Sequence, residues 1–284
     1  MTGRQMITEA QNTWCPGCGN FSIQFTLKAI LEGLEKDGFP LENVVLVTGI
    51  GCHAKMADYL NVNSFYSIHG RTLPAAIGIK LANPELKVIV CAGDGDAYAE
   101  GLDHTLFAAK RNVDLTMLVH NNRVYGLTTG QYTPTSPLGF RGKSTPGGTK
   151  ELPLNPLELM LASGATFVAR GYTRRMDLLK RDVMEAINHK GFSFVDVLQI
   201  CATYYNMTEY YNTRIYELKE HDPSNFEAAN RKAREWDYNV DAPIALGVLF
   251  RKELPTFEER FFADTGRSSI NRIAKIREVF QEKI

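Results

Sequence analysis

The sequence predicts an α/β fold, a largely parallel sheet with helices on both faces. One indication is the segment KVIVCAGDGDAYAEGLDHTLFAAKRNVDLTMLVHNN, residues 87–122, which has the pattern of a strand, a turn, a helix and a second strand. Another is the character of its strands, because short continuous apolar runs such as 88–92 and 115–119 are typical of strands covered on both faces. Helix-like segments between such runs indicate βαβ units, whose strands lie parallel.

The first half of the chain alternates strands and helices. An amphipathic stripe that stops before Gly38 and Pro40 predicts the first helix. The helix after the GDG turn has apolar residues at helical spacing, namely Leu102, Leu106, Phe107 and Ala109. The expected order is helix 27–34, strand 43–48, strand 64–68, helix 72–82, strand 88–92, helix 102–109 and strand 115–119.

A long loop rich in Gly, Pro, Ser and Thr follows at 123–152, and loops of this length usually bind ligands or close over them. The elements expected after it are helix 156–161, strand 166–169, helix 176–188, strand 192–200, polar helix 225–235, strand 243–250 and a last helix. That last helix should have Ile273, Ile276 and Phe280 on its inner face. Five tyrosines are expected to pack at a subunit contact, namely Tyr204, Tyr205, Tyr210, Tyr211 and Tyr216.

These elements suggest two parts. Residues 1–202 should form the α/β domain, which includes a short N-terminal segment that contains cysteines. Residues 203–284 should form a C-terminal extension that docks on a partner.

Composition narrows the class of protein. With 284 residues, 44% of them hydrophobic, the chain can form one large or two small domains around a substantial core. Its formal net charge of zero gives no reason to expect nucleic acid or an acidic membrane surface as a partner. The start, MTGRQMITEAQNTW, has no apolar signal segment and no later run approaches a membrane span, so a cytoplasmic location is the default expectation.

Two polar residues follow neighbouring strands of the βαβ segment. Asp94 and Asn122 fall at the carboxyl ends of these strands, where ligands bind in such units, and strands about 4.8 Å apart let both side chains reach one ion. A carboxylate, an amide oxygen and a main-chain carbonyl suit Mg²⁺, with diphosphate oxygens completing its coordination. Gly93 and Gly95 let the backbone approach the phosphates, and the next helix offers them its N-terminal amides.

Other interpretations of the glycine-rich segments are weaker. A dinucleotide-binding fingerprint needs a small residue where Tyr98 stands. A Walker-type phosphate loop at 142–145 would need a leading glycine where Pro137 stands, and the following Pro-Gly-Gly prevents a helix. A remaining alternative is that GDG and NN are only turn residues that close two strands.

Five cysteines in such a chain are expected to serve metal binding or catalysis before disulfides. Four of them lie in polar or Gly-rich turns, namely Cys15, Cys18, Cys52 and Cys201, whereas Cys91 sits inside an apolar strand as a core residue. A redox dithiol at 15–18 is disfavoured because no βαβ-type start precedes it. A four-thiolate centre could hold structural zinc or an iron–sulfur cluster, and the spacing does not separate these two.

At the GDG and NN turns the chain resembles thiamine-diphosphate enzymes, whose signature opens with GDG and closes about thirty residues later with NN. The resemblance implies that Asp94 and Asn122 are side-chain magnesium ligands and that the carbonyl of Val124 is the third. The loop segment YGLTTGQ comes directly after these residues, so its amides are expected to hold the diphosphate.

From about Trp14 to Asn206 the chain is similar to the β subunits of the 2-oxoacid:ferredoxin oxidoreductases. The segments that carry this resemblance are WCPGCGN, GIGCHAKMADYL, SIHGRTLPAAIGIKLANPE, residues 93–112, HNN, YGLTTGQ and CATYYN. It implies that Cys15, Cys18, Cys52 and Cys201 bind one 4Fe–4S cluster. The cofactor contacts expected on these grounds are Gly51, Cys52, His53, His69, Gly93, Asp94, Gly95, Asp96, Asn122, Val124, Gly126, Leu127 and Thr128.

The resemblance also implies a reaction and partners. An electron acceptor next to thiamine gives a decarboxylated 2-oxo acid an oxidative route, so we expect a 2-oxo acid and coenzyme A to give acyl-CoA, CO₂ and reduced ferredoxin. A larger α subunit should supply the missing half of the thiamine site. His69 and Lys55 are the candidate catalytic residues, Lys55 as a cation for the substrate carboxylate, with Arg141 and Lys143 as weaker candidates.

The tail PIALGVLFRKELPTFEERF and the short chain favour 2-oxoglutarate over pyruvate as substrate. The chain departs from its relatives at His53, Asn121 and Thr129, where serine, aspartate and lysine are common; the last departure leaves the substrate range open. One alternative function is half of a non-redox thiamine decarboxylase or synthase with structural zinc. Another is a non-catalytic phosphate-binding module.

Overall fold

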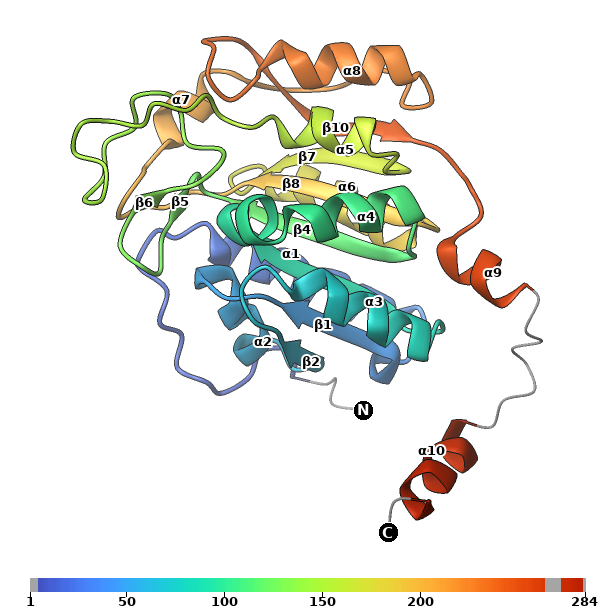
Figure 1. Cartoon of the computed structure of the whole chain (residues 1–284). Coiled ribbons are helices and arrows are strands. Elements are labelled where there is room, and N and C mark those ends of the chain that lie inside the picture. Colours follow the sequence, from blue (N-terminus) through green and yellow to red (C-terminus); the bar gives the residue numbers. More distant parts are fainter. Residues whose placement is uncertain (1–4, 264–271, 283–284) are drawn as a thin grey trace.

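Eight strands of the computed structural model form one sheet, in the order β2-β1-β3-β4-β8-β7-β10-β9 (Figure 1). The structure describes residues 5–263 and 272–282. Only β10 and β7 pair antiparallel among the neighbours in this sheet, so the predicted largely parallel sheet is confirmed. Its strands are β1 Val44–Thr48, β2 Asn63–Tyr66, β3 Lys87–Gly93, β4 Leu115–Asn121, β7 Phe167–Tyr172, β8 Phe192–Leu198, β9 Ile215–Glu217 and β10 Ile244–Arg251.

Helices cover both faces of the sheet, as predicted. One apolar core lies under α3, α4, α5 and α8, and a second lies under α1, α2 and α6. Successive residues of β3 alternate between them, because Val88 and Val90 belong to the first core and Ile89 and Cys91 to the second. The helices are α1 Asn20–Lys36, α2 Met56–Tyr59, α3 Thr72–Ala82, α4 Leu102–Arg111, α5 Pro156–Ala162, α6 Met176–Asn188, α7 Thr208–Asn212, α8 Phe226–Glu235, α9 Phe257–Phe262 and α10 Arg272–Gln281.

Two expectations about single elements need correction. Strand β2 ends at Tyr66 rather than at residue 68, and its four residues are exposed because it forms the edge of the sheet. Phe107 is exposed, since α4 buries the small residues Thr105, Ala108 and Ala109 instead. The ring of Phe107 is contacted by the cationic groups of neighbouring basic side chains on α4.

Residues after 202 contribute to the same sheet as the residues before it. Strand β10 pairs with β7, and β9 pairs with β10. A third apolar cluster, which includes Tyr172, Tyr211, Trp236 and Ile244, joins the two parts of the chain. Tyr211 is thus a core residue, and its expected place at a subunit contact was wrong. The division at residue 202 and the docking role of the extension stay predictions.

The last helix, α10, forms as predicted at 272–281. Phe280 is exposed in the single chain, so it does not lie on an inner face there. The side chains of Ile273 and Ile276 lie outside the described residues.

The loop after Asn122 begins with a short hairpin of β5 Val124–Tyr125 and β6 Gln131–Tyr132. Residues 133–155 then form no helix or strand, and an isolated bridge between Gly142 and Thr145 replaces the helix that a Walker-type loop requires. Within the residues that the structure describes, no helix is both long and apolar enough to cross a membrane.

Candidate active site

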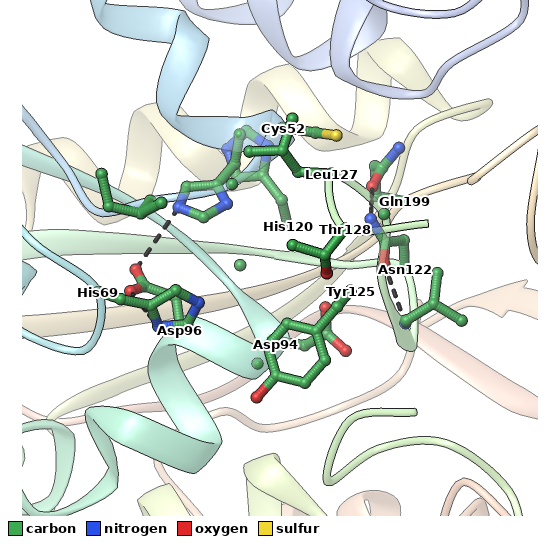
Figure 2. A pocket seen from close by; sticks show the side chains of 17 residues that line it. Cys52, His69, Asp94, Asp96, His120, Asn122, Tyr125, Leu127, Thr128 and Gln199 are labelled. Carbon is green, nitrogen blue, oxygen red and sulfur yellow. Dashed lines mark hydrogen bonds and ion pairs between the residues drawn. The ribbon is translucent and has the colours of Figure 1, made fainter. Parts of the chain in front are cut away.

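A cavity opens at the carboxyl ends of β1, β3 and β4 (Figure 2). It brings together all the residues that the sequence predicted as cofactor contacts, from segments as far apart as Gly51 and Thr128. This convergence follows from the topology, because parallel strands that pair in register end at one edge of the sheet. We call it the cofactor cavity.

Asp94 is buried at the base of the cofactor cavity, directly after β3. Its Oδ2 accepts hydrogen bonds from the hydroxyls of Thr133, at 2.5 Å, and Thr135, at 3.0 Å. Burial raises the pKa of Asp94 to about 6, and the two hydroxyls oppose this rise by stabilising the charged form. The hydroxyls of the long loop therefore leave the charge of the Asp94 carboxylate incompletely neutralised, which is the electrostatic setting that favours a cation.

Asn122 follows β4 on the other side of the cavity. Its Oδ1 accepts a hydrogen bond from the backbone amide of Val124 at 3.0 Å. Between them Arg123 adopts a left-handed backbone with φ of 65°, and its buried guanidinium donates to the carbonyl of Thr135 at 2.7 Å. The turn that carries Asn122 and Val124 is thus anchored to the segment that contacts Asp94.

The donors near Asp94 fit a magnesium ion chemically. A carboxylate, the amide oxygen of Asn122 and the carbonyl of Val124 are hard oxygen ligands. In the described part of the chain, no three His, Cys, Asp or Glu side chains are grouped to hold a metal ion. This does not concern the predicted magnesium set, in which Asp94 is the one ligand of those four residue types.

Asp96 connects three segments that border the cavity. Its carboxylate accepts hydrogen bonds from the amide of Gly70 at 2.6 Å and the hydroxyl of Thr72 at 3.0 Å. Nε2 of His53 lies 3.5 Å from its Oδ2. Burial alone would raise the pKa of Asp96, but the hydrogen bond and charge of His53, with the Gly70 amide, lower it overall. Asp96 is therefore ionised, and its contacts with Gly70, Thr72 and His53 hold the cavity wall together.

Two glycines are needed for this arrangement. A Cβ on Gly93 would lie 2.8 Å from Nδ1 of His53, and one on Gly49 would lie 2.0 Å from the Asp96 carboxylate. The strand-end glycines therefore make room for side chains as well as for a ligand.

The two candidate catalytic residues are separated. His69 lines the cofactor cavity, with its Nδ1 3.2 Å from Oε2 of Glu100 and 3.4 Å from Oδ1 of Asp96. Lys55 instead donates to the hydroxyl of Thr13 at 2.8 Å and lines a neighbouring cavity.

This neighbouring cavity contains the four cysteines that the sequence singled out, Cys15, Cys18, Cys52 and Cys201. We call it the cysteine cavity. Burial raises the pKa of the Cys18 thiol to about 12, and the other three cysteines add to this effect. Cys91 lies away from it, fully buried in the core under α1 and α6.

The cysteine cavity has room for a group that several sulfurs could share. A Cβ on Gly126 would lie 3.5 Å from Sγ of Cys52 and 3.9 Å from Sγ of Cys201, so the missing side chain leaves space beside both sulfurs. Within the described residues these cysteines are not grouped closely enough to form a metal site. Four thiolates that line one cavity suit either zinc or an iron–sulfur cluster chemically.

Sequence reasoning missed three residues that line the cofactor cavity, namely Ile50, His120 and Gln199. His120 is the most distinctive, because its Nε2 is buried without a hydrogen-bond partner while Nδ1 lies 2.8 Å from Oδ1 of Asn20. Burial lowers the pKa of His120 well below its usual value, so the ring is neutral. Its position at the end of β4, one residue before NN, was the available signal.

Comparison with known protein families identifies two matching regions. A model of the C-terminal, thiamine pyrophosphate-binding domain of thiamine pyrophosphate enzymes matches residues 49–197. A model of the C-terminal part of the pyruvate ferredoxin oxidoreductase β subunit matches residues 201–263.

Curated relatives match most of the chain. The 2-oxoacid:ferredoxin oxidoreductase subunit β of Saccharolobus solfataricus is 44% identical, over 88% of this chain and 85% of the relative. The 2-oxoglutarate synthase subunit KorB of Methanothermobacter thermautotrophicus is 32% identical, over 95% of this chain and 93% of the relative.

A solved structure has the same fold. The 2-oxoglutarate:ferredoxin oxidoreductase from Magnetococcus marinus, determined with 2-oxoglutarate, coenzyme A and succinyl-CoA bound, is 30% identical and superposes with a TM-score of 0.87. The match covers 96% of this chain and 94% of that chain.

Proposed function

Since this chain belongs to the β subunits of the 2-oxoacid:ferredoxin oxidoreductases, enzymes that require partner subunits, we propose that it binds thiamine diphosphate, Mg²⁺ and one 4Fe–4S cluster. The complex would convert a 2-oxo acid and coenzyme A into acyl-CoA and CO₂ and reduce ferredoxin. The α subunit would complete the thiamine site. A cytoplasmic location is part of the same proposal.

The observation that carries this proposal is the contact between the two cavities. The cofactor cavity and the cysteine cavity share the lining residues Cys52, Asn122, Gly126, Leu127 and Gln199. A group held by the cysteines would therefore lie beside a group held by Asp94 and Asn122. Such proximity suits one-electron transfer and has no evident use in a decarboxylase with structural zinc.

On the magnesium side, we assign Asp94, Asn122 and the carbonyl of Val124 as ligands. The backbone at Gly93 and Gly95 would approach the diphosphate, and the 126–128 segment of the loop would close over it. Thiamine diphosphate, once bound, stabilises the carbanion equivalent that decarboxylation of a 2-oxo acid leaves. Its ring would contact Gly51, Cys52, His53 and His69.

On the electron-transfer side, we assign Cys15, Cys18, Cys52 and Cys201 as the cluster ligands. Anaerobic purification of the complex tests this assignment directly. Replacing any of the four by serine should remove iron and sulfide, whereas Cys91→Ser should retain both. A colourless zinc protein, or iron retained without Cys201, would contradict the cluster.

For the substrate we favour 2-oxoglutarate. Lys55 has no carboxylate partner among the interactions of the described residues, and its ammonium lies beside the cysteines rather than inside the cofactor cavity. It could therefore meet the distal carboxylate of a longer substrate more readily than the carboxylate next to the keto group.

A kinetic comparison decides the substrate. We expect the reconstituted complex to show a higher kcat/KM for 2-oxoglutarate than for pyruvate, with viologen as acceptor, and Lys55→Met to reduce this preference. A tenfold preference for pyruvate, about 1.4 kcal/mol in transition-state binding, would contradict the choice.

A further inference from the structure

Gln199 belongs to both cavities. It follows the last residue of β8, is buried, and lies two positions before Cys201. Its backbone amide donates to the carbonyl of Asn121 at 2.9 Å, which fixes it against the end of β4. Figure 2 shows the Gln199 side chain beside the proposed magnesium ligand Asn122, and the same residue also lines the cysteine cavity.

Each polar atom of the Gln199 amide has a defined partner. Oε1 accepts a hydrogen bond from Nδ2 of Asn122 at 2.8 Å. Nε2 donates to the carbonyl of Ile200 at 2.5 Å and contacts Sγ of Cys18 at 3.5 Å, a normal length for a hydrogen bond to sulfur. The two hydrogens and the oxygen are all used, so the reversed amide orientation would break every one of these bonds.

This orientation determines how Asn122 can act. Because Nδ2 of Asn122 is directed to Gln199, its Oδ1 is left on the opposite side, where it accepts from the Val124 amide. A flipped Asn122 would present an NH₂ group, which cannot bind a cation. The hydrogen bond to Gln199 therefore holds the Asn122 side chain in the orientation that leaves Oδ1 available to a magnesium ion.

The contact with Cys18 depends on a close approach of the cysteine segment. The amide of Gly19 donates to the Ile200 carbonyl at 2.9 Å, and a Cβ on Gly19 would lie 3.0 Å from Cγ of Gln199. An N–H that points at a thiolate sulfur stabilises its negative charge, and hydrogen bonds to the sulfurs are one factor that sets the potential of an iron–sulfur cluster.

We propose that Gln199 is a positioning residue that joins the two cofactor sites through one side chain. Its oxygen holds Asn122 in the metal-binding orientation, and its amide N–H raises the reduction potential of the cluster through Cys18. This inference rests on the proposed function, because it assumes that both groups bind where the two cavities meet.

Two substitutions separate the two roles. Gln199→Met removes both the acceptor and the donor. We expect it to weaken Mg²⁺-dependent binding of thiamine diphosphate about tenfold or more, a usual cost of losing a residue that orients a ligand, and to move the cluster potential to more negative values. Gln199→Glu keeps an acceptor for Asn122 but has no N–H, so cofactor affinity should stay close to wild type while the potential still falls.

Gln24→Met is the matched control. Gln24 is an equally buried glutamine on α1 whose Nε2 contacts the carbonyl of Tyr59 at 3.5 Å. It should leave both the affinity and the potential at wild-type values, although it changes the same chemical group.

The measurements are calorimetric titration with thiamine diphosphate and Mg²⁺, and a redox titration of the cluster followed by electron paramagnetic resonance, both on the anaerobic complex. A potential unchanged in both Gln199 variants, or an affinity lost equally in Gln199→Glu and Gln199→Met, would overturn the inference. If Gln199→Met does not fold, the cofactor affinity of Gln199→Glu still decides, because its carboxylate keeps the acceptor for Asn122 and a lost affinity would contradict that role. A wild-type complex without iron or without cofactor binding would instead refute the proposed function.

Discussion

Asp94 combines two properties that oppose each other in a folded protein. It is buried, which disfavours its charge, and it is surrounded by donors from the long loop, which favour it. A bound cation resolves this conflict better than either hydroxyl can. This combination supports the proposal that Asp94 is a magnesium ligand.

Replacement of Asp94 by alanine should therefore abolish Mg²⁺-dependent binding of thiamine diphosphate, since the diphosphate charge would lose its bridging ion. Calorimetric titration with and without Mg²⁺ measures this loss. Asp103→Ala, at an exposed position on α4, is the control and should bind as wild type. Unchanged affinity in the Asp94 variant would mean that the GDG turn has no role in metal binding.

At the scale of residues, the sequence predicted which residues lie at the ends of strands. It did not predict which side chains from distant segments contact them. Asp94, Asn122 and Cys52 each follow a predicted strand, so their convergence followed from the sheet alone. Gln199 lies inside the strand predicted at 192–200, whereas the observed β8 ends at Leu198. Its importance also depends on Cys18, which is 181 positions away in the sequence. Thr133 and Thr135 stand in an irregular loop, where no periodic pattern indicates which side chains turn inward.

Among the elements, α6 carries an acidic residue in an unfavourable place. Burial raises the pKa of Asp182 to about 7, although the charge of Arg181 opposes this rise. The native state then keeps a proton that the unfolded chain releases near pH 4. This contribution to stability is fully present below pH 4 and is lost as the pH rises to about 7.

Asp182→Asn should therefore be more stable than wild type at pH 8, with an advantage that grows by up to about 1.4 kcal/mol per pH unit between about pH 4 and 7. Thermal unfolding of both proteins at pH 5 and pH 8 measures the difference. Comparing the two proteins at each pH removes the effect of other titrating groups. An advantage that shrinks as the pH rises would show that Asp182 is ionised in the native state well below pH 7.

The order and type of the elements were predictable because each apolar run corresponds to one element that is buried along most of its length. Strand β3 is covered on both faces and reads as an unbroken apolar segment. Strand β2 lies at the edge of the sheet, and its side chains are exposed because no other element in the described part of the chain covers them. The local sequence does not show which elements cover a strand. The prediction that Phe107 lies on the inner face of its helix was wrong for a similar reason. Small residues on α4 pack closely against the core, and the ring of Phe107 lies on the outer face.

For the whole molecule, the C-terminal part of the sheet is the main point that the sequence did not predict. Strand β10 pairs antiparallel with β7, and Trp236 and Tyr238 pack over the buried guanidinium groups of Arg123 and Arg170. The loop that carries Asn122 is therefore supported from residues beyond 202. Contacts between segments so distant have no local signature.

A chain that ends at residue 202 should consequently lose cooperative unfolding, because β7 would lose β10, one of its two partner strands, and the third apolar cluster would lose Trp236 and Ile244. A chain that ends at residue 263 keeps all eight strands and is the control. Circular dichroism during heating distinguishes them. A sharp transition in the shorter chain would show that residues 1–202 fold as an independent domain.

The central claim is that a thiamine site and a cluster site meet in this chain and work as one when the α subunit is present. The most direct test is electron paramagnetic resonance of the anaerobic complex after addition of 2-oxoglutarate and coenzyme A. We expect the signal of a reduced cluster in the wild-type complex, and none in the Asp94→Ala complex or in the purified β chain alone. A cluster that stays oxidised in the wild-type complex with either 2-oxoglutarate or pyruvate, or one that is reduced equally without Asp94, would contradict the claim.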